Sequence, residues 1–97
     1  MSRIPIEPGR AVCSIAGRDR GKRLVVLSVD GGYACVADGD LRKVEKPKKK
    51  KMRHLKATAE YFSNIAEIVT EGKLPSNAEI RKCLQTDRQG RIEIGKE

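Results

Sequence analysis

The stretch PGRAVCSIAGRDRGKRLVVLSV, residues 8–29, decides the fold of this chain. It contains two segments of mostly apolar residues, 10–16 and 22–30, and we expect each to form a β-strand. The loop between them, GRDRG at residues 17–21, has a glycine at each end and alternating charges. Glycine adopts positive φ angles at no steric cost, and arginine forks suit phosphate oxygens. The sequence therefore predicts a strand pair that presents a basic loop, with Gly21 at a positive φ or against a neighbouring strand.

Turn signals divide the residues that follow into further short strands. The run LVVL at 24–27 is apolar without alternation, which is typical of a strand buried on both faces. The Gly-Gly pair after Asp30 predicts a tight hairpin into a third strand at 33–37. A turn at 38–40 then leads to a fourth, more polar strand at 41–45. Short strands at this spacing predict a small antiparallel β-barrel.

The densest charge in the chain is the run KPKKKK at residues 46–51. Mutual repulsion among five lysines favours an extended, solvated segment rather than a packed element. A solvated linker and a nuclear-localisation signal are two interpretations of such a run. Because a closing strand at 52–55 is expected to follow, we interpret the run as a basic loop between strands of the barrel.

From Thr58 onward the apolar period changes from that of a strand to that of a helix. Thr58 is a suitable N-cap, and Gly72 is placed to end the helix in a left-handed conformation. The expected helix has about 13 residues. Its apolar face is formed by Phe62, Ile65, Ala66 and Val69.

A second helix of about nine residues is predicted to start at Ser76. The sequence Ser76-Asn77-Ala78-Glu79 is a capping box, and apolar residues at 80, 83 and 84 follow it. We expect the two helices to pair as a hairpin and to cover part of the barrel or a second copy of the chain. Residues 91–94 are compatible with a short strand or a frayed tail. The predicted organisation is a barrel with its basic loop at 1–56 and a helical extension at 57–97.

Charge is distributed unevenly along the 97 residues, whose formal net charge is +8 and whose pI is near 9.7. Residues 1–56 contain fifteen Lys and Arg against six Asp and Glu, whereas residues 57–97 contain six against seven. The predicted barrel therefore carries +9 and the helical extension −1. A basic domain of this kind favours a polyanionic partner such as nucleic acid.

The first strand pair also resembles a known motif. Gly9, Val12, the segment from Ile15 to Lys22 and the apolar run after it look like a KOW motif. Over residues 8–56 the chain resembles KOW proteins of archaeal and eukaryotic large ribosomal subunits and their small bacterial relatives. Asp38-Gly39 and the lysine run also stand where the bacterial relatives have them. The resemblance implies an SH3-like barrel that binds RNA.

We therefore expect this protein to bind structured RNA, most simply ribosomal RNA in the cytoplasm. A-form RNA hides its base edges in a deep groove, so a small basic barrel would recognise backbone and shape. Only 3% of the residues are aromatic, which argues against a base-stacking platform for single strands. The cationic side chains expected to contact phosphates are Arg18, Arg20, Lys22 and Arg23 in the first loop, Lys46, Lys48, Lys49, Lys50 and Lys51 in the second, and Arg42, Lys43, Arg53 and Lys56 beside them.

Other functional classes find less support in the sequence. It contains no phosphate-loop, dinucleotide-binding, zinc-protease or serine-elbow motif, and we expect neither an enzyme nor a cofactor. Cys13, Cys35 and Cys83 lack the spacing of a zinc site and fit buried thiols in a reducing compartment. No apolar run approaches the length of a membrane span. The remaining alternative is a protein-interaction module that docks onto ribosomal or transcription proteins through the barrel and the helices.

Overall fold

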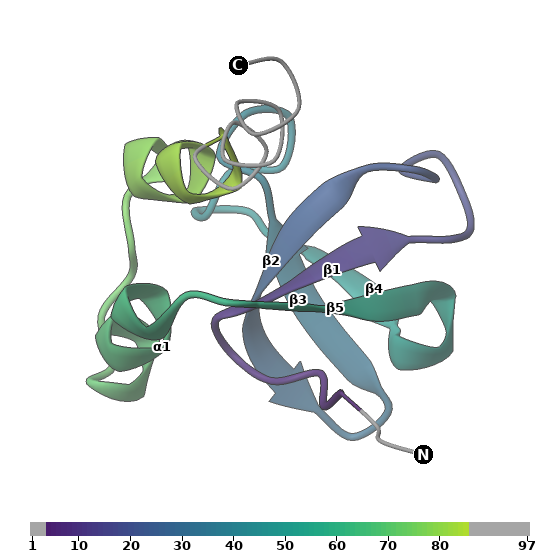
Figure 1. The fold of residues 1–97 in the computed structure, drawn as a ribbon, viewed down its shortest axis with the longest axis horizontal. Helices are drawn as coiled ribbons and strands as arrows, with labels where there is room; N and C mark the ends of the chain where they lie inside the picture. The colour runs from purple at the N-terminus through teal and green to yellow at the C-terminus, as the bar shows by residue number, and fades with distance from the viewer. Residues whose placement is uncertain (1–3, 86–97) are drawn as a thin grey trace, which may run out of the picture.

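The computed structural model describes residues 4–85, which form five strands and two α-helices (Figure 1). In chain order the elements are β1 (Arg10–Ser14), β2 (Arg23–Asp30), β3 (Tyr33–Ala37), β4 (Lys48–Lys51), the 3-10 helix η1 (Met52–His54), β5 (Leu55–Tyr61), α1 (Ser63–Thr70) and a helix over residues 77–85. All strand pairs are antiparallel, in the order β4-β3-β2-β1-β5. Both helices lie to the left of the sheet in Figure 1. The predicted strand or tail at 91–94 lies outside the described residues.

Strand β2 is the centre of the sheet, because it pairs with β1 on one side and β3 on the other. Leu24, Val25 and Val26 are fully buried, and Leu27 is nearly so. Leu24 and Val26 belong to one apolar cluster, whereas Val25 and Leu27 belong to another. Successive strand residues point to opposite faces, so a run without polar residues supplies two cores at once. The prediction of a strand buried on both faces is confirmed.

The two cores lie on opposite faces of the sheet. The buried residues of the core on the face away from the helices all belong to strands, and we call it the strand-only core. They are Val12, Leu24, Val26, Ala34, Val36 and Leu55. In the other core the helices cover the sheet, and it contains Val25, Leu27, Ala37, Val44, Ile65, Ile80 and Leu84. Each fully buried Val, Leu or Ile side chain contributes about 1.5–3 kcal/mol relative to exposure. Of the two coverings expected for the helical stripes, the structure shows packing on the protein's own sheet.

The first three strands form where the sequence predicts them, but the fourth does not. Strand β1 ends two residues earlier than expected, β2 begins one residue later, and β3 matches. Residues 41–45 are a loop rather than a strand. The Asp38 carboxylate folds this loop by accepting hydrogen bonds from the backbone N–H groups of Asp40 and Arg42, each at 2.8 Å. A side chain that binds nearby backbone donors competes with strand pairing.

The lysine run is the largest departure from expectation. Residues 48–51 are not a solvated loop but strand β4, which pairs with β3 from Val36↔Lys48 to Tyr33↔Lys51. The expected closing strand at 52–55 is replaced by η1, which turns the chain into β5. Strand β4 has a neighbour on one side only. Lysines are tolerated there because an edge strand keeps most of its side chains in water.

The second helix, at 77–85, matches the prediction, whereas the first matches it only in part. Thr58 does not begin a helix; it lies in β5, where its hydroxyl donates a 2.7 Å hydrogen bond to the carbonyl of Ala11. Helix α1 therefore begins at Ser63 and has eight residues. Gly72 has the expected left-handed φ of 83°. The capping box forms, since Ser76 Oγ accepts the N–H of Glu79 at 3.0 Å and the Glu79 carboxylate accepts the N–H of Ser76 at 2.9 Å.

The sheet is open in the part of the chain that the structure describes. Strands β4 and β5 stand at opposite edges, and no described pairing joins them. The expected closed barrel is therefore not observed, and the architecture is a mostly β domain with two short helices. Strand β5 runs from residue 55 to residue 61 and so continues past residue 56, where the predicted barrel ends.

Candidate nucleic-acid interface

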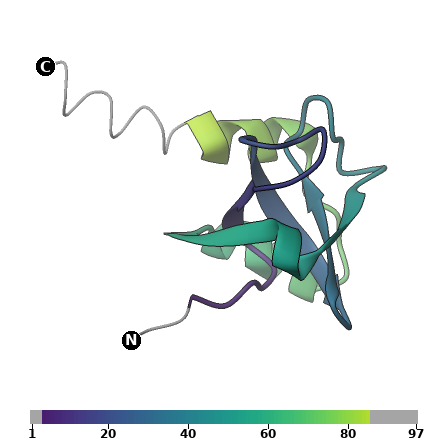
Figure 2. The same ribbon diagram turned by 90° about the vertical axis from the view of Figure 1, so that its right-hand side faces the viewer.

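Three segments that carry predicted RNA-binding residues lie together on the side of the sheet away from α1. They are the loop at residues 15–22, strand β4 and helix η1, all on the right of Figure 1 and facing the viewer in Figure 2. The N–H of Ile15 donates to the carbonyl of His54 at 2.9 Å, which joins the loop to η1. The Lys50 ammonium donates to the carbonyl of Ala16 at 3.4 Å, which joins the loop to β4. The loop is therefore held against β4 and η1.

Gly21, at the end of this loop, adopts the predicted conformation. Gly21 has a φ of 87°, and its N–H donates a 2.8 Å hydrogen bond to the carbonyl of Ser14. A Cβ at this position would meet no atom within 4 Å, so the positive φ, and not a close approach, requires glycine. The turn returns the chain from β1 to β2 and leaves Arg18 and Arg20 exposed at its tip.

Asp19, which lies between those two arginines in the sequence, is buried and pairs with cations from two other segments. Its side chain accepts hydrogen bonds from the Arg42 guanidinium at 3.1 and 3.2 Å. The Lys50 ammonium lies 3.7 Å from the same carboxylate. Burial raises the pKa of the Asp19 carboxyl, but the hydrogen bond and charge of Arg42 and the charge of Lys50 outweigh burial and lower the pKa overall. Asp19 is therefore an ionised, internally neutralised group.

This arrangement removes Lys50 from the set of solvated cations that the sequence predicts. Lys50 is 8% exposed, and in the register of β4 it lies opposite Ala34, a residue of the strand-only core. Directly opposite residues share one face of a sheet, so Lys50 points inward. A buried ammonium requires a compensating charge, which Asp19 supplies. The lysine therefore serves the fold of the loop.

Three more predicted residues are engaged within the protein. Arg42 holds Asp19, and the Lys22 ammonium lies 3.9 Å from the Asp38 carboxylate. The Arg23 guanidinium donates to the Leu84 carbonyl at 3.0 Å and to the Glu60 carboxylate. These cations hold loops and helices to the sheet.

The other predicted residues are exposed, and we call them together the basic surface. They come from the loop at 15–22, from residues 38–47, which we call the loop before β4, from β4 itself, from η1 and from the start of β5. The exposed acids among the described residues of these segments are Asp40 and Glu45, both in the loop before β4. The basic surface consists of Arg18, Arg20, Lys43, Lys46, Lys48, Lys49, Lys51, Arg53 and Lys56.

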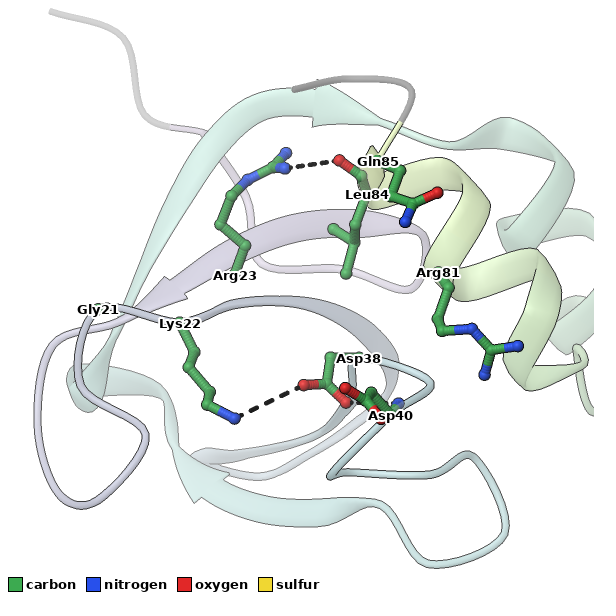
Figure 3. A pocket seen from close by; sticks show the side chains of 8 residues that line it. All are labelled: Gly21, Lys22, Arg23, Asp38, Asp40, Arg81, Leu84 and Gln85. Atoms are coloured by element: carbon green, nitrogen blue, oxygen red, sulfur yellow. Dashed lines mark hydrogen bonds and ion pairs between the residues drawn. The ribbon is translucent and has the colours of Figure 1, made fainter. Parts of the chain in front are cut away.

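A cavity of about 430 Å³ lies between the base of the loop at 15–22 and the 77–85 helix (Figure 3). Its charges are paired: in Figure 3 the Lys22 ammonium points to Asp38. The Arg81 guanidinium donates to the Gly39 carbonyl at 2.6 Å. Three cations and two acids line the cavity, and the third cation, Arg23, is paired with Glu60 outside the lining. Because its cations are engaged within the protein, we regard this cavity as a junction between helix and loop and not as an anion site.

Asn77 also fixes the 77–85 helix to the loop before β4. The Asn77 amide oxygen accepts the N–H of Val44 at 2.8 Å, and its amide nitrogen donates to the Glu45 carboxylate at 3.0 Å. Gly39, with a φ of 79°, packs so closely on this helix that a Cβ would lie 2.4 Å from the Asn77 carbonyl oxygen. This contact holds the loop that carries Lys43 and Lys46.

Sequence reasoning missed Asp19 as a structural centre and missed the alternation within the lysine run. A signal for the first was present, since Asp19 is the one acid in a loop flanked by glycines and arginines. No pattern marks Lys50 apart from its neighbours, because four identical residues carry no periodicity. Pairing with β3 puts Lys48 and Lys50 on the same face of β4, and of these two Lys50, which is paired with Asp19, is the one that is buried.

No protein-family model matches this chain, and no curated protein matches it. Within residues 4–85, no group of three or more His, Cys, Asp or Glu side chains is placed to hold a metal ion. None of the helices described is long and apolar enough to cross a membrane.

Proposed function

We propose that this protein binds structured RNA, with ribosomal RNA in the cytoplasm as its target, through the basic surface. The observation that carries the proposal is the concentration of nine exposed cations on neighbouring segments, while Asp19, the acid of the first loop, is buried and neutralised. The local surface is therefore more positive than the sequence of that loop suggests. A surface of this kind attracts phosphate backbones at long range and binds them by releasing counterions.

We further infer that the open sheet is a form of the SH3-like barrel implied by the KOW resemblance. Register shifts between Arg10 and Val12 in β1 and between Val26 and Ser28 in β2 bend the sheet. Helix η1 has only three residues, so the end of edge strand β4 is close to the start of edge strand β5. Bent strands with connected edges support a barrel-like arrangement of the five strands.

The proposed contact is electrostatic and follows the shape of the RNA. Exposed lysines and arginines reach phosphates from a rigid sheet edge and from the glycine-bounded loop, whose position the Asp19 contacts fix. Fixing the loop in the free protein lowers the ordering cost on binding. Phosphates on both sides of an A-form groove are the natural targets for cations spread over several segments.

The packing of the helices weighs against the alternative of a protein-interaction module. That alternative gives the apolar helical stripe to a partner, whereas Ile65 is buried against the sheet and Ala66 is buried beside Gly9. Phe62 and Val69 are partly buried in the same cluster. The stripe is thus already covered by the protein's own residues.

The test is the salt dependence of binding to a ribosomal RNA fragment. Lys48→Gln combined with Lys51→Gln should flatten the slope of log K against log salt by up to about 2, since each phosphate contact contributes about 0.7–0.9. The matched control is Lys73→Gln combined with Lys82→Gln, which removes two exposed lysines from the helical side. The control should keep the wild-type slope, and circular dichroism should match for all three proteins.

Equal slopes for the two double variants would contradict the basic surface as the binding site. The ribosomal part of the proposal has its own test, which is co-sedimentation of the full chain with ribosomes at low and high salt. We expect co-sedimentation at low salt and release at high salt. Co-sedimentation that ignores salt would favour docking onto ribosomal proteins.

A further inference from the structure

A shallow hollow opens beside the lysine edge of the sheet, at the turn from β4 into η1. Its lining residues are Gly32, Tyr33, Lys51, Met52 and Arg53, and its volume is about 470 Å³. The N–H of Met52 donates to the Gly32 carbonyl at 2.8 Å, which joins η1 to the β2–β3 hairpin. The walls of the hollow are therefore fixed by main-chain contacts.

The hollow combines two apolar side chains with cations. Tyr33 is 39% exposed, a large value for an aromatic residue in a strand. Met52 is half-buried beside it and also packs on the strand-only core. A tyrosine ring offers a face for stacking, and the thioether of methionine adapts to irregular shapes. Together they can accept a flat aromatic group.

The charges around the tyrosine ring are mostly positive. The Lys49 ammonium lies 5.0 Å from the ring centroid, a cation–π contact that holds the ring in place. Lys51 lies directly opposite Tyr33 in the strand register, and Arg53 lines the hollow from η1. On β2 an acid, Asp30, lies opposite Tyr33 in the strand register. Three cations thus face one acid.

We propose that this hollow binds a single unpaired nucleotide of the RNA, with the base against Tyr33 and Met52 and the flanking phosphates on Lys51 and Arg53. The inference rests on the proposed function and adds to it, because phosphate contacts alone do not bind any particular base of the RNA. The site takes one base and not a strand, since Tyr33 is the one Tyr, Phe or Trp among the segments that form the basic surface and the hollow, and His54 of η1 does not line the hollow. Such a site would direct the protein to RNA helices that carry a bulged nucleotide or an unpaired end.

The test compares three RNA hairpins that differ at one position: fully paired, with one bulged adenosine, and with an abasic bulge. Stacking of one base on an aromatic side chain changes affinity by at least about fivefold. The wild-type protein should therefore prefer the bulged adenosine over both other hairpins by about fivefold or more. A 2-aminopurine at the bulge should change fluorescence on binding.

Tyr61 provides a matched control for Tyr33. It is 46% exposed and also lies under a cation, since the Arg10 guanidinium carbon is 5.1 Å from its ring centroid, but it is at the end of β5 beside α1. Tyr33→Leu should abolish the preference for the bulged adenosine, whereas Tyr33→Phe and Tyr61→Leu should keep it. Adenosine monophosphate should not compete, because a free nucleotide carries one phosphate and lacks the second one that a nucleotide within RNA has.

The possible results distinguish failure of this site from failure of the proposed function. Equal affinity of the wild-type protein for the three hairpins, with a steep salt dependence, overturns the nucleotide site and leaves the basic surface standing. Competition by adenosine monophosphate overturns it in favour of a free-nucleotide site. Failure of all three hairpins to bind overturns both. The hairpin comparison uses the wild-type chain, so it holds even where Tyr33→Leu does not fold.

Discussion

Strands β2 and β4 belong to one sheet, yet they form for different reasons. Strand β2 contains the apolar run LVVL, pairs with two neighbours and is buried on both faces. Strand β4 is the run KKKK, pairs with β3 alone and leaves three of its four side chains exposed. Burial of side chains stabilises the first. Main-chain pairing and one buried ion pair stabilise the second.

A high density of like charge therefore does not by itself predict a loop. A sheet edge offers unpaired backbone donors and acceptors to any segment that can be extended, and repulsion among lysines favours extension. The inward-pointing Lys50 is compensated by Asp19, a residue 31 positions earlier in the chain. Strand β4 can therefore present Lys48, Lys49 and Lys51 on a fixed backbone, in contrast to a flexible linker.

The largest expected effect comes from truncating β2. Leu24 is fully buried, so Leu24→Ala should lower the free energy of unfolding by about 3–4 kcal/mol, through lost burial and the cavity left behind. The matched change in β4, Lys49→Ala, removes an exposed side chain and one cation–π contact and should cost less than about 1 kcal/mol. Urea denaturation measures both. Similar losses for the two variants would mean that the strands are stabilised alike.

A smaller effect is expected from Asp19→Asn, which leaves the Lys50 ammonium buried without its carboxylate. We expect a loss of about 2–3 kcal/mol at neutral pH, below the usual cost of breaking a buried ion pair because the Ala16 carbonyl still accepts a hydrogen bond from Lys50. Urea denaturation of the variant and the wild type at neutral pH measures this loss. Asp40→Asn, at an exposed acid, is the control and should cost little.

The pH dependence of the same pair follows from the lowered pKa of Asp19. A carboxyl whose folded pKa lies below its unfolded value, ordinarily 3.8, stabilises the fold fully above that value. The contribution is lost as the pH falls through the lower folded pKa. The difference in stability between wild type and Asp19→Asn should therefore shrink below about pH 4. A difference that stays constant down to acid unfolding would contradict the ion pair.

The sequence predicts well where local chemistry decides the structure. The apolar run of β2, the hairpin before β3, the left-handed Gly21 and the capping box at Ser76 each depend on residues close in the chain, and each is confirmed.

Prediction fails where a distant partner decides the structure. Thr58 fits an N-cap, but it lies in β5, which pairs with β1, and its hydroxyl donates a hydrogen bond to the Ala11 carbonyl. Residues 41–45 are an exception, because a nearby group decides their structure: the Asp38 carboxylate accepts the backbone N–H of Arg42. A distant partner again decides for the lysines of the candidate site. Which of them are exposed depends on the register of β4 and on a carboxylate in another loop.

We propose that RNA binding belongs to the basic surface and that the helices serve the fold. Because β5 extends to Tyr61 and both helices cover the sheet, the claim is best tested on the full chain and not by truncation at residue 56. The most direct measurement is the set of backbone amide NMR shifts during titration with a structured ribosomal RNA fragment. We predict that the shifts concentrate in the loop at 15–22, β4 and η1, and that α1 and the 77–85 helix change little. Shifts concentrated in the two helices, with the β4 amides unmoved, would contradict the account.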